Sequence, residues 1–241
     1  MERSKIQGLY DICTEVFSDK EPPTFQKIQW LRSFLDTIEA IDVGIDEFDS
    51  EGSPRSWVSC PSSPEGSRGL ISGLAVTEIT YIHIYESDDF SIGIFCFPAG
   101  SSLPLHDHPG MTVLSKVLYG SVYCKAYDWL KVDTANCRMI GLASTVMEGI
   151  IKAPKQASVL FPRSGGNIHS FTALTPCAIL DVLSPPYSDE FGRPSTYFSD
   201  IPIPSLPGYV ILEERDLPED LVVTGAPYLG PQLVTDDVDV C

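Results

Sequence analysis

The residues best suited to carry out chemistry are four histidines, because neutral imidazole is a common side-chain ligand of metal ions. His106 and His108 are separated by a single residue, and alternate side chains of a β-strand point to the same face. On a strand, this spacing directs two imidazoles at one point, where they can hold a metal. His169 follows a pair of glycines and supplies a third candidate ligand. His83 has no partner motif, and we expect it to be structural.

Short β-strands are the elements that must position these histidines. Between about residue 80 and residue 198 the apolar residues follow a strand period, and Gly and Pro mark the turns. The expected strands cover residues 81–85, 90–97, 111–119, 121–127, 150–153, 158–161, 169–174 and 178–183. Many short strands without intervening helices indicate a mainly β fold, either a sandwich or a small barrel. The number and spacing suit a cupin-type double-stranded β-helix (jelly roll).

The first histidine pair lies in a glycine frame that is typical of cupins. Gly100 precedes the pair and Gly120 follows it at the spacing of the first cupin motif. That motif usually places a glutamate ligand four or five residues after the pair, where this chain has Thr112 and Val113. His169 stands three residues after a glycine pair, as the second motif expects. The pattern predicts a metal site of three histidines and no carboxylate, against the alternative of unrelated surface and core histidines.

Three neutral ligands affect the chemistry of such a site. Imidazoles hold zinc, copper, nickel or iron, so the ligand type alone does not select the metal. A site without a carboxylate keeps one more positive charge than a site with two histidines and one carboxylate. This positive charge favours a substrate that binds as an anion, such as a thiolate. A metal also lowers the pKa of a bound thiol, so the thiolate forms at neutral pH. Three protein ligands leave positions open for a substrate and for dioxygen.

The charge balance limits the partners of the protein. The chain of 241 residues has 33 acidic and 16 basic residues, which gives a net charge of −17. A surface this acidic disfavours direct binding to nucleic acid and to anionic membranes. Residues 211–241 contain eight acidic residues and one basic residue, so this segment alone carries −7. We interpret the acidity mainly as a solubility feature, with attraction of a basic peptide as a second role.

Cysteine usage and the N-terminus indicate a compartment. The seven cysteines are scattered, odd in number and without a C-x-x-C pair, which favours reduced thiols over disulfides or a zinc finger. The first residues are polar, and no apolar stretch approaches the ~18–20 residues of a membrane helix. We therefore expect a cytoplasmic and nuclear protein with no membrane partner.

Three segments are expected along the chain. Residues 1–51 carry a helical period and form an N-terminal helical segment that packs on the barrel. Thr24 is the expected N-cap of the second helix, whose apolar pattern continues to Ile41. Residues 52–70 are rich in Gly, Ser and Pro and predict a flexible loop. Residues 71–241 then form the barrel domain with its acidic C-terminal tail.

Several sequence blocks resemble a known family. HDHPGMTVLSK at residues 106–116 and SGGNIH at residues 164–169 are specific when they occur together. YDWL at residues 127–130 and CAILDVLSPPY at residues 177–187 accompany them. With these blocks the chain resembles the plant cysteine oxidase family, relatives of animal cysteamine (2-aminoethanethiol) dioxygenase. The resemblance runs from the first helix to residues 227–231.

The resemblance implies a non-haem Fe(II) thiol dioxygenase with O₂ as co-substrate. Its iron ligands fall on His106, His108 and His169. Enzymes of this family oxidise an N-terminal cysteine of a protein to cysteine sulfinic acid. Their targets include group VII ethylene-response transcription factors, whose oxidation starts arginylation and turnover through the N-degron pathway. The resemblance thus implies oxygen sensing, Cys-initiated protein or peptide partners and no direct nucleic-acid binding, and we expect a monomer. It implies no further bound cofactor.

The same resemblance points to two catalytic candidates outside the histidine motifs. Asp181 lies in an otherwise apolar strand, where a carboxylate without a partner costs free energy. We expect it to accept the substrate ammonium or to hold Tyr187, against the alternative of a bond to a loop backbone. The phenol of Tyr187 is expected to bond to substrate or oxygen, against the alternative of simple packing. Ser195 departs from the family, whose members tend to carry cysteine at this position.

Other functions remain as competing interpretations of the histidine constellation. One is a cupin enzyme with a different metal, or a dioxygenase of a small free thiol. Another is a non-catalytic cupin that serves as a binding module. The missing glutamate counts against the usual four-ligand cupin site. Retention of all three histidines counts against a site that has lost its metal.

Overall fold

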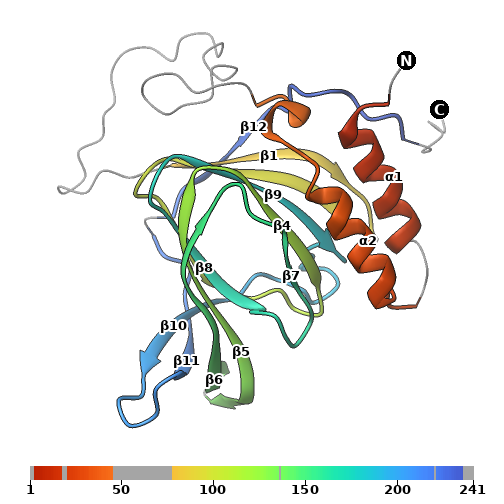
Figure 1. Cartoon of the computed structure of the whole chain (residues 1–241). Helices are drawn as coiled ribbons and strands as arrows, with labels where there is room; N and C mark the ends of the chain where they lie inside the picture. Colours follow the sequence, from red (N-terminus) through yellow and green to blue (C-terminus); the bar gives the residue numbers. More distant parts are fainter. Residues whose placement is uncertain (1–2, 18–20, 46–77, 136, 220, 236–241) are drawn as a thin grey trace. The chain divides into compact units, whose positions relative to one another are not determined.

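The computed structural model describes residues 3–17, 21–45, 78–135, 137–219 and 221–235 (Figure 1). The expected flexible loop at residues 52–70 lies outside these described residues. The chain divides into two compact units. The first combines the N-terminal region up to residue 66 with residues 227–241, and the second spans residues 67–226. No helix within the described ranges is long and apolar enough to cross a membrane.

The described part of the first unit contains two helices and a short 3₁₀ helix, in the order α1 (Lys5–Phe17), α2 (Phe25–Leu35) and η1 (Ala40–Val43). The hydroxyl of Thr24 accepts a hydrogen bond from the backbone N–H of Lys27, which confirms the expected N-cap. The predicted helical pattern through Ile41 is wrong beyond Leu35. The chain leaves the α-helix there, and the hydroxyl of Thr37 donates to the Phe34 carbonyl and satisfies this helix end.

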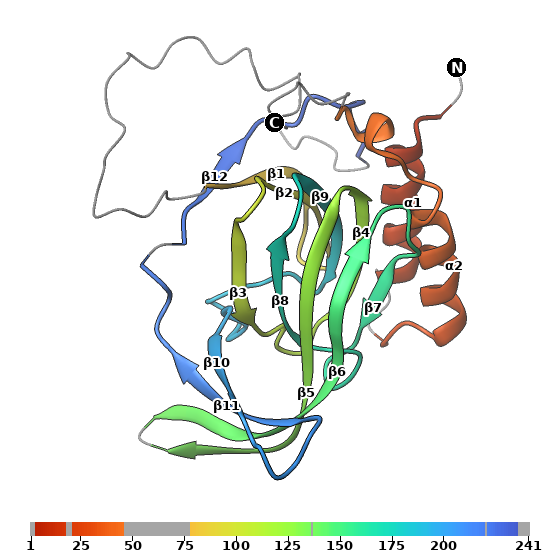
Figure 2. The same cartoon turned by 60° about the vertical axis from the view of Figure 1, so that its left-hand side comes forward.

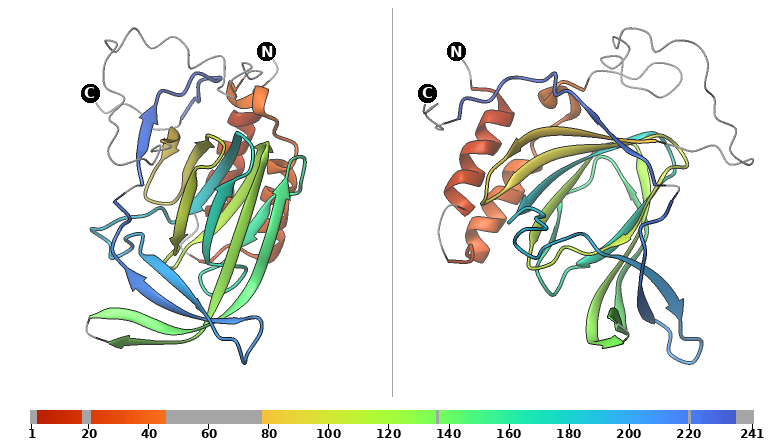
Figure 3. Two further views of the ribbon diagram at one scale, coloured as in Figure 1. Left: turned by 90° about the vertical axis from the view of Figure 1, so that its left-hand side faces the viewer. Right: turned by 180° about the vertical axis from the view of Figure 1, so that it is seen from behind.

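The described residues of the second unit form twelve strands. They are β1 (Ile79–Glu86), β2 (Ser91–Phe97), β3 (Ser102–His106), β4 (Thr112–Tyr119), β5 (Ser121–Ala135), β6 (Arg138–Lys152), β7 (Ser158–Leu160), β8 (Ile168–Ala173), β9 (Cys177–Ser184), β10 (Tyr197–Pro202), β11 (Tyr209–Arg215) and β12 (Val223–Ala226). One sheet has the order β12-β1-β2-β9-β4-β7, and the other strands close a barrel in the order β10-β11-β6-β5-β8-β3. Figure 3 shows the two sheets as facing walls. The mainly β, jelly-roll fold expected of a cupin is therefore confirmed.

Each of the eight predicted strands has a counterpart, but the prediction missed β3, β10, β11 and β12. For β6, the prediction covered only the last residues of the strand. Pro104 interrupts the pattern of β3, and Gly141 and Gly149 weaken the pattern of β6. Cross-strand pairing along the long β5–β6 hairpin overrides these local signals. Figure 2 shows this hairpin extending past the other strands together with β10 and β11.

The apolar core of the second unit lies between the two sheets. One cluster joins residues from both sheets, with Phe97 from β2, Val122 from β5 and Ile179 from β9 among its members. A second cluster around Tyr127 and Phe198 is built from the barrel strands. These clusters hold β3 and β8 side by side, and their register pairs His106 with His169. The core thus fixes two of the candidate ligands on adjacent strands.

Candidate metal centre

The three motif histidines meet at one point in the barrel. His106 is the last residue of β3, His108 lies two residues beyond it, and His169 is the second residue of β8. Their ring centroids are 4.6–4.9 Å apart, and one candidate ligand atom from each ring lies within 4.8 Å of the others. All three side chains are buried. The structure therefore brings the predicted ligands together.

The local reason differs from the one that the spacing suggested. Because β3 ends at His106, His108 does not share a strand face with it. The side chain of Asn167 holds His108 instead, since its Oδ1 accepts from the His108 N–H at 3.2 Å and its Nδ2 donates to the His108 carbonyl at 2.9 Å. This contact joins the end of β3 to the start of the neighbouring strand β8 and brings the two rings together.

Backbone carbonyls fix the orientation of the rings. The Nδ1 atom of His106 donates to the Pro104 carbonyl at 2.9 Å, and that of His108 donates to the Asn167 carbonyl at 2.8 Å. A carbonyl only accepts, so these bonds place the proton on Nδ1 and leave Nε2 free as a ligand. The ring of His169 also hydrogen-bonds to the backbone of Gly166. Such bonds from the non-ligating nitrogen are usual at metal-binding histidines.

Burial keeps the imidazoles neutral. It lowers the pKa of His106 and, with the neighbouring His106 ring, lowers the pKa of His108 to about 3. Burial and the two other rings lower the pKa of His169 well below its usual value. Neutral imidazole is the form that binds a metal, so the three groups are ready ligands at neutral pH.

The loop before His169 is held by a single carboxylate. Asp128 on β5 accepts hydrogen bonds from the backbone N–H groups of Gly165, Gly166 and Asn167, all between 2.9 and 3.0 Å. Gly166 has a φ of +86°, and a Cβ there would lie 2.7 Å from the Cβ of Ala126. A glycine is required because this backbone conformation and this close approach exclude a side chain. The carboxylate and the glycine together position Asn167 and the strand that carries His169.

The residue between the first two histidines is tied to the start of β10. The carboxylate of Asp107 accepts from the Thr196 N–H at 2.9 Å, and the Asp107 N–H donates to the Thr196 carbonyl at 3.1 Å. The hydroxyl of Tyr187 donates to the Asp107 carbonyl at 2.6 Å. Burial raises the pKa of Tyr187 well above its usual value, and a hydrogen bond with the Ser195 side chain partly offsets this. The predicted catalytic Tyr187 therefore contacts the backbone of the histidine turn.

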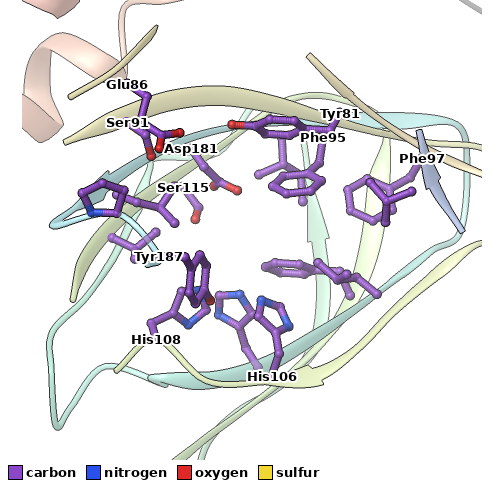
Figure 4. Close-up of a pocket in the computed structure, with 18 of the residues that line it drawn as sticks. Tyr81, Glu86, Ser91, Phe95, Phe97, His106, His108, Ser115, Asp181 and Tyr187 are labelled. Atoms are coloured by element: carbon purple, nitrogen blue, oxygen red, sulfur yellow. The ribbon is translucent and has the colours of Figure 1, made fainter. Parts of the chain in front are cut away.

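A cavity of about 380 Å³ lies in front of the histidines (Figure 4). Its size falls within the range of small-molecule binding sites. The predicted residues all line it: the three histidines, Asp181 and Tyr187. Burial raises the pKa of Asp181 to about 7, and a hydrogen bond with the Ser115 side chain partly offsets the shift. The Oδ1 atom of Asp181 is buried and has no hydrogen-bond partner among the described residues.

His83 lies on β1, away from the cluster. Its side chain is exposed, and it is not part of the group that could hold a metal in the described part of the chain. The residues present fit a transition-metal ion well, since three buried neutral rings offer free nitrogens at one point. A metal held by these three side chains alone would have coordination positions left for a substrate, as in catalytic sites.

Sequence reasoning missed the residues that support the ligands. Asn167 and Asp128 are the most important of these, because they hold His108 and the loop before His169. Each stands inside a block of sequence that resembled the family, SGGNIH and YDWL. Their polar side chains, close to a ligand motif in the sequence or within a family block, were the signal that could have indicated a supporting role. Their partners lie far away in the sequence, so the contacts themselves were not predictable from spacing.

A cupin barrel with three convergent imidazoles defines a candidate mononuclear metal protein. The chain belongs to the PCO_ADO family, whose model matches residues 34–233. This membership confirms the resemblance seen in the sequence blocks.

The relatives cover most of the chain. Plant cysteine oxidase 1 and plant cysteine oxidase 2 of Arabidopsis thaliana are 41% and 39% identical to it over 95% of its length, and the match covers 80% and 83% of those proteins. The 2-aminoethanethiol dioxygenase of Homo sapiens is 30% identical, with 88% of this chain and 83% of that protein covered. Among solved structures, an RmlC-like cupin protein from Desulfovibrio desulfuricans is 22% identical, covers 50% of this chain and 97% of its own, and has a TM-score of 0.32.

Proposed function

We propose that this protein is a metal-dependent thiol dioxygenase that oxidises an N-terminal cysteine to cysteine sulfinic acid. The observation that carries the proposal is the group of three neutral imidazoles, which includes no carboxylate among the described residues, in a family whose relatives are named cysteine oxidases and 2-aminoethanethiol dioxygenases. The reaction R–SH + O₂ → R–SO₂H places both oxygen atoms on sulfur, so it requires no external reductant. Sulfinic acid is effectively irreversible in most proteins, which suits a signal for degradation.

Fe(II) is the metal that we assign to His106, His108 and His169. When bound, iron supplies the redox chemistry that lets dioxygen react with a thiolate. The protein orients the three rings through backbone carbonyls and keeps them neutral by burial. The aromatic side chains that line the cavity exclude water from the reacting atoms.

Two further residues act on the substrate or on the ligands in this proposal. Asp181 accepts the α-ammonium group of the cysteine, because its buried Oδ1 lacks a partner and lines the same cavity. Tyr187 acts through its bond to the Asp107 carbonyl, which supports the turn between His106 and His108. The phenol thus positions two ligands, and its ring, which also lines the cavity, forms part of the wall that meets the substrate.

The biological targets follow from the family resemblance. We propose that they are Cys-initiated proteins such as group VII ethylene-response transcription factors, oxidised in the cytoplasm and nucleus as an oxygen-sensing step of the N-degron pathway. The net charge of −17 supports recognition of the N-terminal tail of such a factor and opposes contact with its DNA. Size-exclusion chromatography with light scattering tests the expected monomer.

The decisive experiment mixes Fe(II)-loaded protein with a Cys-initiated peptide in air. Mass spectrometry of the peptide should show the gain of two oxygen atoms on the cysteine. His169→Ala should abolish this gain, whereas His83→Ala should retain it because His83 lies outside the metal cluster. Parallel reactions with free cysteine and with cysteamine distinguish a peptide substrate from a small thiol.

Two results would contradict the proposal. One is an unchanged peptide with the Fe(II)-loaded wild type, which would favour a binding module or another metal. The other is an equal mass gain with His169→Ala, which would place the reaction outside the histidine cluster. Metal analysis of each protein ensures that a loss of activity reflects loss of the bound ion.

A further inference from the structure

The cavity wall away from the histidines contains, beside Asp181, polar groups that the proposed reaction leaves unused. Three adjacent strands place Gly93 of β2, Asp181 of β9 and Ser115 of β4 in one row, since Asp181 pairs with both of the others. Ser115 and Asp181 both line the cavity. Gly93 contributes no side chain, and this leaves space beside the Asp181 carboxylate.

The ring of Tyr81 fills that space. A Cβ on Gly93 would lie 2.7 Å from Cζ of Tyr81 and closer still to its hydroxyl. Tyr81 comes from β1 and packs against Phe95, with ring centroids 4.9 Å apart. Figure 4 shows its hydroxyl directed toward the side of the cavity that holds Asp181 and Glu86. The missing side chain at Gly93 therefore determines where this hydroxyl lies.

Glu86 completes this wall. It is the last residue of β1, pairs with Ser91 of β2 and lines the cavity beside it. Burial raises the pKa of Tyr81 to about 12, and the carboxylates of Glu86 and Asp181 add to the shift. Both acids thus lie close enough to Tyr81 to act on its hydroxyl electrostatically.

No lysine or arginine is among the described residues that line the cavity. Two carboxylates therefore face the space, and the described lining residues include no side-chain cation to pair with them. The buried Oδ1 of Asp181, which has no partner among the described residues, is an independent sign that a ligand supplies the missing donor. One ammonium group satisfies Asp181, whereas Glu86, whose side chain is exposed to solvent at the cavity, meets no lysine or arginine among the described lining residues.

We propose that Tyr81 and Glu86 form a second subsite, which selects a cationic side chain on the residue that follows the N-terminal cysteine. This inference rests on the proposed function, because it assumes that the cysteine sulfur lies at the histidines and its ammonium at Asp181. The ammonium of a lysine at the second position then pairs with Glu86, and the hydroxyl of Tyr81 accepts a hydrogen bond from it. A glutamate at that position meets like charge and is disfavoured.

The test uses two peptides, Cys-Lys-Gly-Ala-Gly and Cys-Glu-Gly-Ala-Gly, which differ only at the second residue. The wild-type kcat/KM should favour the lysine peptide by about fivefold at low salt, the upper end for a solvent-accessible ion pair. Glu86→Gln should reduce the ratio to about twofold or less. Tyr81→Phe, which keeps the ring over Gly93, should reduce it in part.

Asp88→Asn is the matched control, because it removes the same charge from an exposed position two residues away that does not line the cavity. It should keep the full preference. Affinities of both peptides for the Fe(II)-loaded protein, measured by calorimetry under nitrogen, provide a readout that does not depend on turnover.

Equal kcat/KM and equal affinities of the wild type for the two peptides would overturn the subsite. A preference that survives in Glu86→Gln would overturn it as well. If the wild type oxidises neither peptide in air, the proposed function is wrong, and the affinities under nitrogen still decide the subsite.

Discussion

The hydroxyl of Tyr187 donates a 2.6 Å hydrogen bond to the backbone carbonyl of Asp107, the residue between two of the candidate metal ligands. Tyr187 comes from the segment after β9, 80 residues further along the chain. The ring centroid of Tyr187 is 5.7 Å from that of His108. A side chain that lines the substrate cavity thus also supports the backbone that carries the ligands.

Tyr187→Phe should destabilise the protein and weaken its metal site. The Asp107 carbonyl loses a buried donor, which costs about 1–3 kcal/mol of unfolding free energy. Urea unfolding measures this loss. Tyr209→Phe serves as a control because Tyr209 lies on the exposed surface of β11. Unchanged stability and unchanged Fe(II) affinity in Tyr187→Phe would show that the bond to Asp107 has no positioning role.

Asn167→Ala should lower the affinity for Fe(II). The substitution removes both side-chain bonds to the backbone of His108, and loss of such support typically costs ~10–100-fold in metal affinity. Competition with a chelator measures the dissociation constant. Asp128→Asn should weaken binding to a smaller extent, since it acts one step further from the ligands. Wild-type affinity in Asn167→Ala would contradict the proposed positioning of His108.

Asp181 should make the metal-free protein less stable as the pH rises. Burial raises its folded-state pKa to about 7 from the ordinary value of 3.8, so the folded state binds the proton more tightly than the unfolded state. Below pH 4 the carboxyl is protonated in both states and does not lower the free energy of unfolding. Between about pH 4 and 7 the loss of unfolding free energy grows, because the buried carboxyl resists ionisation. At about 1.4 kcal/mol per pKa unit, the cost at pH 8 is at most about 4 kcal/mol.

Asp181→Asn, which has no proton to lose, tests this expectation. The difference in unfolding free energy between the variant and the wild type should shift in favour of the variant from pH 4 to pH 8. Urea titrations at several pH values, on protein treated with a chelator, measure the difference. A difference that stays constant with pH would contradict a raised pKa. The same variant should lose turnover, because the amide cannot balance the charge of an ammonium group.

Gly93→Ala should displace the ring of Tyr81. The added methyl group meets the ring, and such overpacking typically costs about 1–3 kcal/mol. Removal of the ring in Tyr81→Ala should relieve the clash, so the double variant should lose less stability than the sum of the single variants. Thermal or urea unfolding of the four proteins in this cycle measures the coupling. Additive losses would show that the ring does not occupy the space over Gly93.

The local sequence determined the histidine motifs and most of the strands. The spacing of His106 and His108 and the glycine pair before His169 identify the candidate ligands, because each motif lies within a few residues. The alternation of apolar residues located parts of eight strands for the same reason. The apolar pattern did not predict the strands that contain proline, glycine or many polar residues, since only pairing with distant partners stabilises them.

The tertiary structure decided what surrounds the ligands. Three contacts join residues that are 12 to 80 positions apart in the sequence: Asn167 with His108, Tyr187 with Asp107, and Tyr81 with Gly93. Strand order and register set these pairs, and both depend on the packing of the whole barrel. The types of the ligands could thus be determined from the sequence alone, whereas the polar wall opposite them arises only when β1, β2, β9 and β4 lie side by side.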